Sequence, residues 1–287
     1  KFEVSFNSNI TFSDPLKLPS YQNSYGQGAT NDFFQYVDGA GGGYNDGVDE
    51  SWGAPLDIGL NFVQWDSYKV GGAPTPWVSN PDNVKDFFDT GVSVTNSISM
   101  SGGSDISNFR VSIGNSDETG MVPFTDFKKF NVSLNGSTQL GKKATTGGSV
   151  NYFNNKSNNL PTVGYNNQNV VQQFIWSARQ VNFSDFKDWR NMPLAPENTL
   201  AAGTPINWNN SFQNNPYWIL ENNRNTFDQD RFTGNAYLNF KFNDNLSVNG
   251  KLMLDHYSQR ETLRSEIGTN EFQNGYYAEV ARRYSEV

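Results

Sequence analysis

Apolar side chains alternate with small polar side chains in seven stretches of the chain. Within residues 129–140, for example, Phe130, Val132 and Leu134 alternate with Asn131 and Ser133. Because successive side chains of a strand point to opposite faces, this pattern predicts β-strands with one apolar and one polar face. The predicted strands are residues 1–12, 92–101, 105–115, 129–140, 144–155, 230–242 and 246–259.

The predicted strands are long, and their polar faces carry few charges. They run about 10–14 residues, whereas strands of soluble proteins cluster near about 5–6 residues and a tilted strand that crosses a membrane needs about 9–11. Neutral amides and hydroxyls suit a wall that faces a water-filled lumen. The candidate lumen-wall residues are Asn131, Asn135, Gln139, Asn151, Asn235 and Asn239.

The connections between these strands alternate between very short and very long. The short ones are tight turns at residues 101–105, 141–143 and 243–245. The long ones are residues 13–91, 116–128 and 156–229. Short turns at one end and long loops at the other are typical of an outer-membrane barrel, whose long loops lie outside the cell. The predicted fold class is therefore all-β, as part of a large antiparallel transmembrane barrel.

The strand count and the helical segments complete this prediction. Seven strands cannot close an ordinary bacterial barrel, whose strand number is even, and the chain opens in mid-strand, so we expect the rest of the barrel outside this chain. Residues 260–287 are predicted to form an external loop. Short helices are predicted at residues 80–91, with Asp82 in the first turn and Gly91 as the stop, and at residues 166–189.

Composition excludes several classes of function. The net charge is −8 without a basic run, which argues against a nucleic-acid partner. The absence of cysteine excludes disulfides, thiol nucleophiles and cysteine-based zinc sites, and the single histidine, His256, is expected on the lipid side of its strand. No pair of carboxylates can be placed at a working distance, so we expect neither catalysis nor a cofactor.

All seven tryptophans fall within the two longest predicted loops. One interpretation is that such loops need cores of their own, which large rings fill efficiently. A second is a vestibule in which flat rings stack on a ligand, and a third is contact with a partner protein. The candidate substrate-binding residues are Trp52, Trp65, Trp77, Trp176, Trp189, Trp218 and Tyr217.

An acidic turn is a weak candidate for a calcium site. Asp46, Asp49 and Glu50 surround Gly47, and oxygen-rich loops with a glycine can hold calcium. Their spacing does not match an EF-hand loop, so a solvated acidic turn is the favoured interpretation.

Several segments, in order and at similar spacing, resemble the SusC/RagA family of TonB-linked outer-membrane transporters of Bacteroidetes. They are "DESWGAPLDIGL" (49–60), "PTPWVSNPDNVKDFFDTG" (74–91), "SISMSGGSDISNFRVSIGNSDETGMVP" (97–123), "NNLPTVGYNNQNVVQQFIWSARQVNFSDFKDW" (158–189) and "NPYWILENNRNTFDQDRFTGN" (215–235). The resemblance implies a 22-stranded barrel with an N-terminal plug, import of oligosaccharides or peptides driven through the TonB complex, and a SusD-like surface lipoprotein as a lid. This chain would then be the first part of the barrel, without the plug.

Two other functions compete with nutrient import across the outer membrane. A soluble all-β carbohydrate-binding module would explain the Trp, Asn and Gly content, but not the strand lengths or the sorting of the loops. A passive porin would lack the plug and the TonB contact. The neutral polar wall favours a glycan over a peptide only slightly, because amides hydrate well in any barrel.

Overall fold

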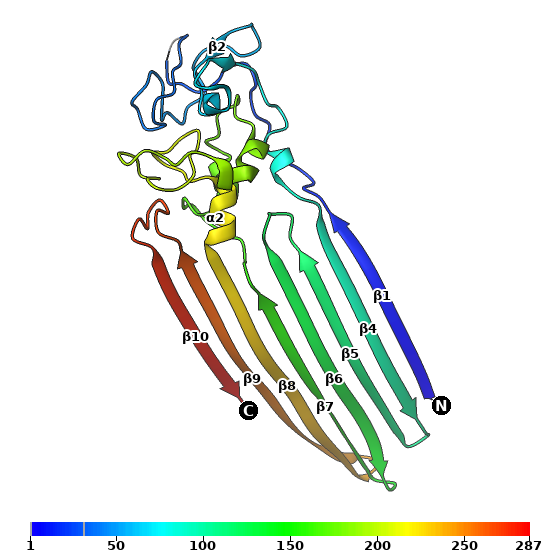
Figure 1. Cartoon of the computed structure of the whole chain (residues 1–287). Coiled ribbons are helices and arrows are strands. Elements are labelled where there is room, and N and C mark those ends of the chain that lie inside the picture. Colours follow the sequence, from blue (N-terminus) through cyan, green and yellow to red (C-terminus); the bar gives the residue numbers. More distant parts are fainter. Residues whose placement is uncertain (1, 31) are drawn as a thin grey trace.

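The chain forms one long antiparallel sheet with a packed group of loops at one end (Figure 1). The computed structural model describes residues 2–30 and 32–287. The strand order is β1-β4-β5-β6-β7-β8-β9-β10, so neighbours in the sheet are neighbours along the chain. The strands are β1 (Phe2–Ser13), β4 (Gly91–Gly103), β5 (Ser107–Thr119), β6 (Asp126–Leu140), β7 (Ala144–Ser157), β8 (Arg224–Asn243), β9 (Leu246–Ser265) and β10 (Tyr276–Glu286).

All seven predicted strands are present, and most extend beyond their predicted ends. β8 and β9 reach 20 residues each. The prediction stopped short of their loop-proximal ends because these ends carry polar residues on both faces, so apolar and polar positions do not alternate there. β5 starts at Ser107 because Asp105 and Ile106 belong to the turn. Lys1, the first residue of the predicted strand 1–12, lies outside the described residues.

The prediction of a loop over residues 260–287 is wrong. β9 continues to Ser265, and residues 276–286 return as β10 in direct register with it, Tyr284 opposite Tyr257. The sheet therefore has eight strands instead of seven. One face of β10 carries Ala281, Arg283 and Ser285, so the apolar alternation that marks the other strands is missing there.

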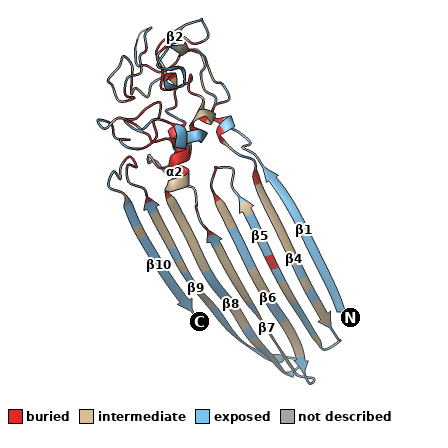
Figure 2. Cartoon of the chain, in the orientation of Figure 1, coloured by how far each residue is buried: buried red, intermediate tan, exposed pale blue. Residues whose placement is uncertain are grey.

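The core of the molecule lies in the loops and not on the sheet. Figure 2 shows buried residues concentrated in the loop group, while the strands are mostly intermediate or exposed. In the larger core, Trp65 and Phe87 of the first long loop pack with Phe174 and Trp218 of the second. Residues 14–90 and 158–223 are therefore one packed unit, which we call the loop unit.

The helical content of the loop unit is lower than predicted. It comprises the 3-10 turns η1 (Ser67–Val70), η2 (Lys85–Phe87) and η3 (Phe183–Asn191) and the short helices α1 (Val170–Gln173) and α2 (Pro216–Asn222), with a small sheet of β2 (Asn61–Phe62) and β3 (Thr75–Pro76). Val84, not Asp82, precedes η2, and Gly91 opens β4 instead of ending a helix.

Residues 166–189 do not form one helix because the other long loop takes their carbonyl groups. The backbone N–H of Asn80 donates to the Arg179 carbonyl at 2.9 Å, and the Asn83 side chain donates to the Val181 carbonyl at 3.0 Å. A continuous helix would need the same carbonyls for its own hydrogen bonds. Within residues 2–30 and 32–287, no helix has the length and apolarity needed to cross a membrane.

Candidate functional site

Along the middle of the sheet, one face is apolar and the other is mostly polar. Direct pairing aligns Phe6, Ile98, Ile113, Val132, Tyr152 and Phe232 in one row across six strands. These side chains point to a single face, which we call the outer face. They are exposed or half-buried, with no second layer over them: Phe6 is 69% exposed and Leu252, lower on the same face, 72%.

The apolar band on the outer face slants across the strands. It runs from Phe2 to Phe12 on β1 and from Leu246 to Leu254 on β9, where it sits closer to the short turns. A drift of about seven residues at about 3.4 Å each, over six interstrand steps of about 4.8 Å, corresponds to a slant of about 40°. This angle lies within the tilt of about 35–45° that strands adopt in closed barrels.

The opposite face, which we call the inner face, carries ladders of polar side chains. Ser133 Oγ donates to Asn151 Oδ1 at 2.7 Å, and Asn151 Nδ2 donates to Thr233 Oγ1 at 3.2 Å. Two rows higher on the same face, Gln229 Nε2 donates to Gln259 Oε1 at 2.8 Å. All six predicted lumen-wall residues lie on this face, on β6, β7 and β8: Asn131, Asn135, Gln139, Asn151, Asn235 and Asn239.

The inner face also carries aromatic and charged residues that the sequence analysis missed. The guanidinium Nε of Arg231 donates to Asp255 Oδ1 at 2.9 Å, and the rings of Tyr257 and Tyr284 stack with centroids 5.5 Å apart. Phe153 lies directly opposite Arg231 in the same row. The alternation in the sequence could have identified these residues, because they occupy the same alternate positions as the lumen-wall amides.

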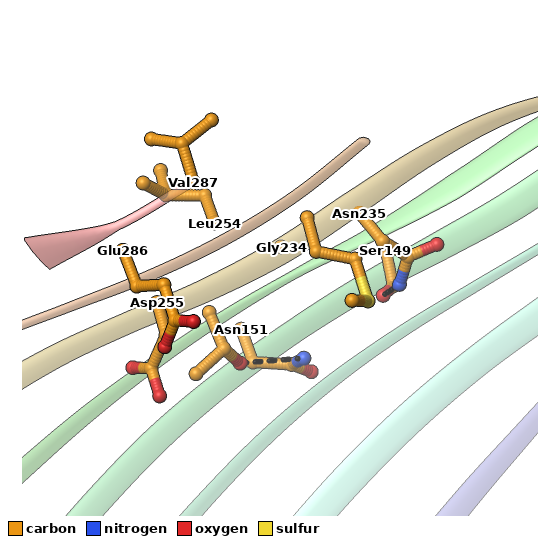
Figure 3. A pocket seen from close by; sticks show the side chains of 10 residues that line it. Ser149, Asn151, Gly234, Asn235, Leu254, Asp255, Glu286 and Val287 are labelled. Carbon is orange, nitrogen blue, oxygen red and sulfur yellow. Dashed lines mark hydrogen bonds between the residues drawn. The ribbon is translucent and has the colours of Figure 1, made fainter. Parts of the chain in front are cut away.

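A hollow of about 360 Å³ opens beside the end of β10 (Figure 3). Its polar lining comes from the inner face, with Asn151, Asp255 and Glu286 close together in the view, and its apolar lining includes Leu254 and Val287. The hydroxyls, amides and carboxylates along this wall can exchange hydrogen bonds with a hydroxylated or peptidic ligand in water.

Four of the seven candidate substrate-binding residues are interior. Trp65 stacks on Phe186 at 4.3 Å, and the indole N–H of Trp77 donates to the Ala54 carbonyl at 3.0 Å. Trp218 and Tyr217 belong to the same core as Trp65, and burial raises the pKa of the Tyr217 hydroxyl. Because Trp65, Trp77, Trp218 and Tyr217 are each less than 9% exposed, they pack the loop unit and present no ring face to a ligand in this structure.

Trp52, Trp176 and Trp189 remain candidates for contact with a ligand or partner. Trp52 is 67% exposed beside Tyr25, and Trp176 is 39% exposed. Trp189 is half-buried, and its indole N–H donates to Glu221 at 3.1 Å. The loop unit therefore offers exposed rings on a rigid support, as protein–protein contact surfaces do.

Asp46, one of the three calcium candidates, serves the backbone instead. Its Oδ2 accepts the N–H groups of Val37, Asp38 and Gly39, each at 3.0 Å. Burial raises the pKa of this carboxyl despite these bonds. Asp46 is therefore a buried carboxylate that stabilises the backbone of residues 37–39.

The other two calcium candidates do not join Asp46 in a metal site. Asp49 accepts the side-chain N–H of Asn209, and burial, followed by the nearby charge of Glu50, raises its pKa to about 6. Glu50 itself is exposed. Among the described residues no group of three or more acidic or histidine side chains is arranged to hold a metal ion, so the structure does not bring these three residues together as a calcium site.

Comparison with known proteins finds a similar fold in part of a larger importer chain. No family model matches the chain, and no curated protein matches it. Among solved structures, the chain is similar to the RagAB peptide importer in its closed-closed state, with a TM-score of 0.61, 17% identity and 99% of this chain covered. It is also similar to the open-open state of that importer, with a TM-score of 0.58 and 16% identity over 99% of the chain.

This chain spans about a third of the length of those structures, since each match covers 31% of the importer chain. At this identity the likeness establishes the shared fold: the sheet is an all-β fragment of a barrel, and its relation to the importers is distant.

Proposed function

We propose that this chain is part of the barrel wall of an outer-membrane transporter that imports oligosaccharides or peptides. The energy would come from the TonB complex, and a SusD-like lipoprotein would cover the loop unit. Both partners follow from the resemblance to the SusC/RagA family. The two similar solved structures are states of one peptide importer, and that name favours an oligomeric nutrient as substrate.

The observation that carries the proposal is the exposed apolar outer face. Phe12 on β1 is 70% exposed, and exposed apolar residues recur on each strand of the long sheet from β1 and β4 through β9. A monomeric soluble protein rarely exposes a contiguous apolar patch beyond a few hundred Å². Hydrocarbon tails would cover this face, with water on the inner side.

The height of the apolar band supports this placement. On β8 the band runs from Phe232 to Phe242. Ten steps of about 3.3 Å at a slant of about 40° give a height of about 25 Å, which is the height of the apolar band of outer-membrane barrels. Aromatic side chains lie at both limits, Tyr152 and Phe232 toward the loops and Phe240 and Phe242 toward the short turns.

The inner face supplies a wet path along which a substrate would pass. Its amides and hydroxyls offer hydrogen bonds without a deep electrostatic trap, and the Tyr257–Tyr284 stack offers a flat apolar surface. A soluble carbohydrate-binding module would need a second layer over the outer face, and no described residue forms one.

Fractionation and uptake test the proposal in the full-length protein. We expect it in the outer-membrane fraction, extractable only with detergent. A deletion strain should lose growth on at least one glycan or peptide in a panel, and a variant that cannot engage TonB should lose it equally. Recovery of the full-length protein in the soluble fraction would refute the membrane placement, and growth independent of TonB would favour the passive porin.

A further inference from the structure

Five charged residues form one continuous row on the outer face, on the loop side of the apolar band. Pairing places Asp117 opposite Lys128, Lys128 opposite Lys156, Lys156 opposite Asp228, and Asp228 opposite Arg260. Each residue comes from a different strand, from β5 to β9 in order. We call these five residues the outer charged row.

The two lysines of the row lie at the level where headgroups begin. Lys128 is two residues beyond Phe130, and Lys156 is four beyond Tyr152. Phe130, Tyr152 and Phe232 form a chain of ring contacts at the loop-side limit of the band, with centroids 6.4 and 4.7 Å apart. Aromatic girdles mark the membrane interface of a barrel, so Lys128 and Lys156, one and two outer-face positions past the girdle, meet polar headgroups.

Two lysines face each other directly within this row. Like charges in directly opposed cross-strand positions repel. Lys128 turns to Asp117 at 3.1 Å and Lys156 to Asp228 at 4.0 Å, away from each other. Both lysine side chains remain 55% exposed, and surface ion pairs of this kind contribute only about 0–1 kcal/mol, so an anion between the two ammonium groups can compete for them.

We propose that Lys128 and Lys156 bind a phosphate group of an outer-leaflet lipid headgroup. The inference rests on the membrane placement proposed above and adds a lipid ligand on the outer face, distinct from the transported substrate on the inner face. One phosphate between opposed ammonium groups removes their repulsion and forms charge-assisted hydrogen bonds with both. Arg260 lies two strands from Lys156 with Asp228 between them and is paired with Glu279 at 2.8 Å, so the site is formed by the two lysines.

The test uses the full-length protein in detergent micelles doped with a diphosphorylated glycolipid, and counts retained lipid by native mass spectrometry. K128Q/K156Q should weaken retention by about fivefold per charge removed. K142Q/K143Q is the matched control, because Lys142 and Lys143 lie in the short turn at the opposite end of the sheet and lose the same charge. The control should retain the lipid as the wild type does.

A third variant separates lipid binding from a purely structural ion pair. D117N frees Lys128 from its carboxylate, so lipid retention should increase even if the fold becomes slightly less stable. Loss of stability without an increase in retention would overturn the proposal. Equal retention of a dephosphorylated glycolipid would do the same.

Two further outcomes are informative. One distinguishes a lipid phosphate from free phosphate, and the other distinguishes failure of the lipid site from failure of the transporter proposal. Full displacement of the lipid by millimolar inorganic phosphate would overturn the commitment to a lipid headgroup, because a lipid held also by its tails should resist the free anion. If wild-type protein needs detergent for extraction but K128Q/K156Q retains lipid normally, only this inference fails and the transporter proposal stands.

Discussion

Arg179 is the residue on which the loop unit depends most visibly. It is 2% exposed, and its guanidinium donates to five acceptors on the other long loop. The closest is Asn83 Oδ1 at 2.7 Å, and the others are Asn23 Oδ1 and the carbonyls of Gln22, Asn80 and Pro81. The Tyr21 ring covers the guanidinium at 4.8 Å. Burial lowers the pKa of Arg179.

Replacing Arg179 with Met keeps an unbranched side chain, shorter than that of arginine, and removes every donor. A buried acceptor left without a partner costs about 1–3 kcal/mol. If water reaches only some of the five acceptors and two or three stay dry, the loop unit loses about 3–5 kcal/mol. The strands should be unaffected, because their ladders do not involve this residue.

Hydrogen exchange and limited proteolysis of the full-length protein in detergent would measure this effect. In R179M, residues 14–90 and 158–223 should exchange faster and become cleavable, while β4 to β9 stay protected. R190M is the control, since Arg190 is 60% exposed and its ion pair with Glu221 is partly solvated. Unchanged protection of both loops in R179M would refute the reasoning, and so would equal loss of protection across the strands.

Three other substitutions give distinct outcomes. L134R should lower the free energy of unfolding in lipid by about 2–4 kcal/mol, measured by denaturant titration in vesicles, while N135R on the inner face should change it by less than 1; equal effects would contradict the assignment of faces. The raised pKa of Asp49, about 6, means that the loop unit loses stability as pH rises from about 4 through 6, so D49N should flatten the pH dependence of protease resistance. In G26A the new Cβ would lie 2.3 Å from the buried Trp77 ring, so the midpoint of loop unfolding should fall, and wild-type fluorescence and midpoint would count against the packing described.

The strands could be predicted closely wherever they pass through the apolar band, because apolar and polar residues alternate there. β6 and β7 were placed within three residues at every end, because apolar residues mark alternate positions along them. β10 was missed for a physical reason: the slanted band passes below its described residues, so its outer positions Arg283 and Ser285 lie among polar groups. A strand above the band carries no period-two signal to read.

The interior of the loop unit could not be read from the sequence. Trp65 meets Phe186 across 121 positions of chain, and only the folded arrangement decides that both rings are buried while Trp52 is not. The Asn-rich segment near residue 209 is similarly ambiguous. Asn210 and Asn214 are fully buried and hydrogen-bond other loops, whereas the same composition reads as a solvated loop.

The central claim is that hydrocarbon covers the outer face and water the inner face. This chain contributes no cysteine of its own, so single cysteines at positions 130 to 135, placed in a full-length protein freed of any other cysteine, can each carry an environment-sensitive fluorophore in lipid vesicles. Fluorophores at 130, 132 and 134 should be quenched by a lipid-borne quencher, and those at 131, 133 and 135 by an aqueous one. Aqueous quenching at all six positions, or a reversed alternation, would contradict the account.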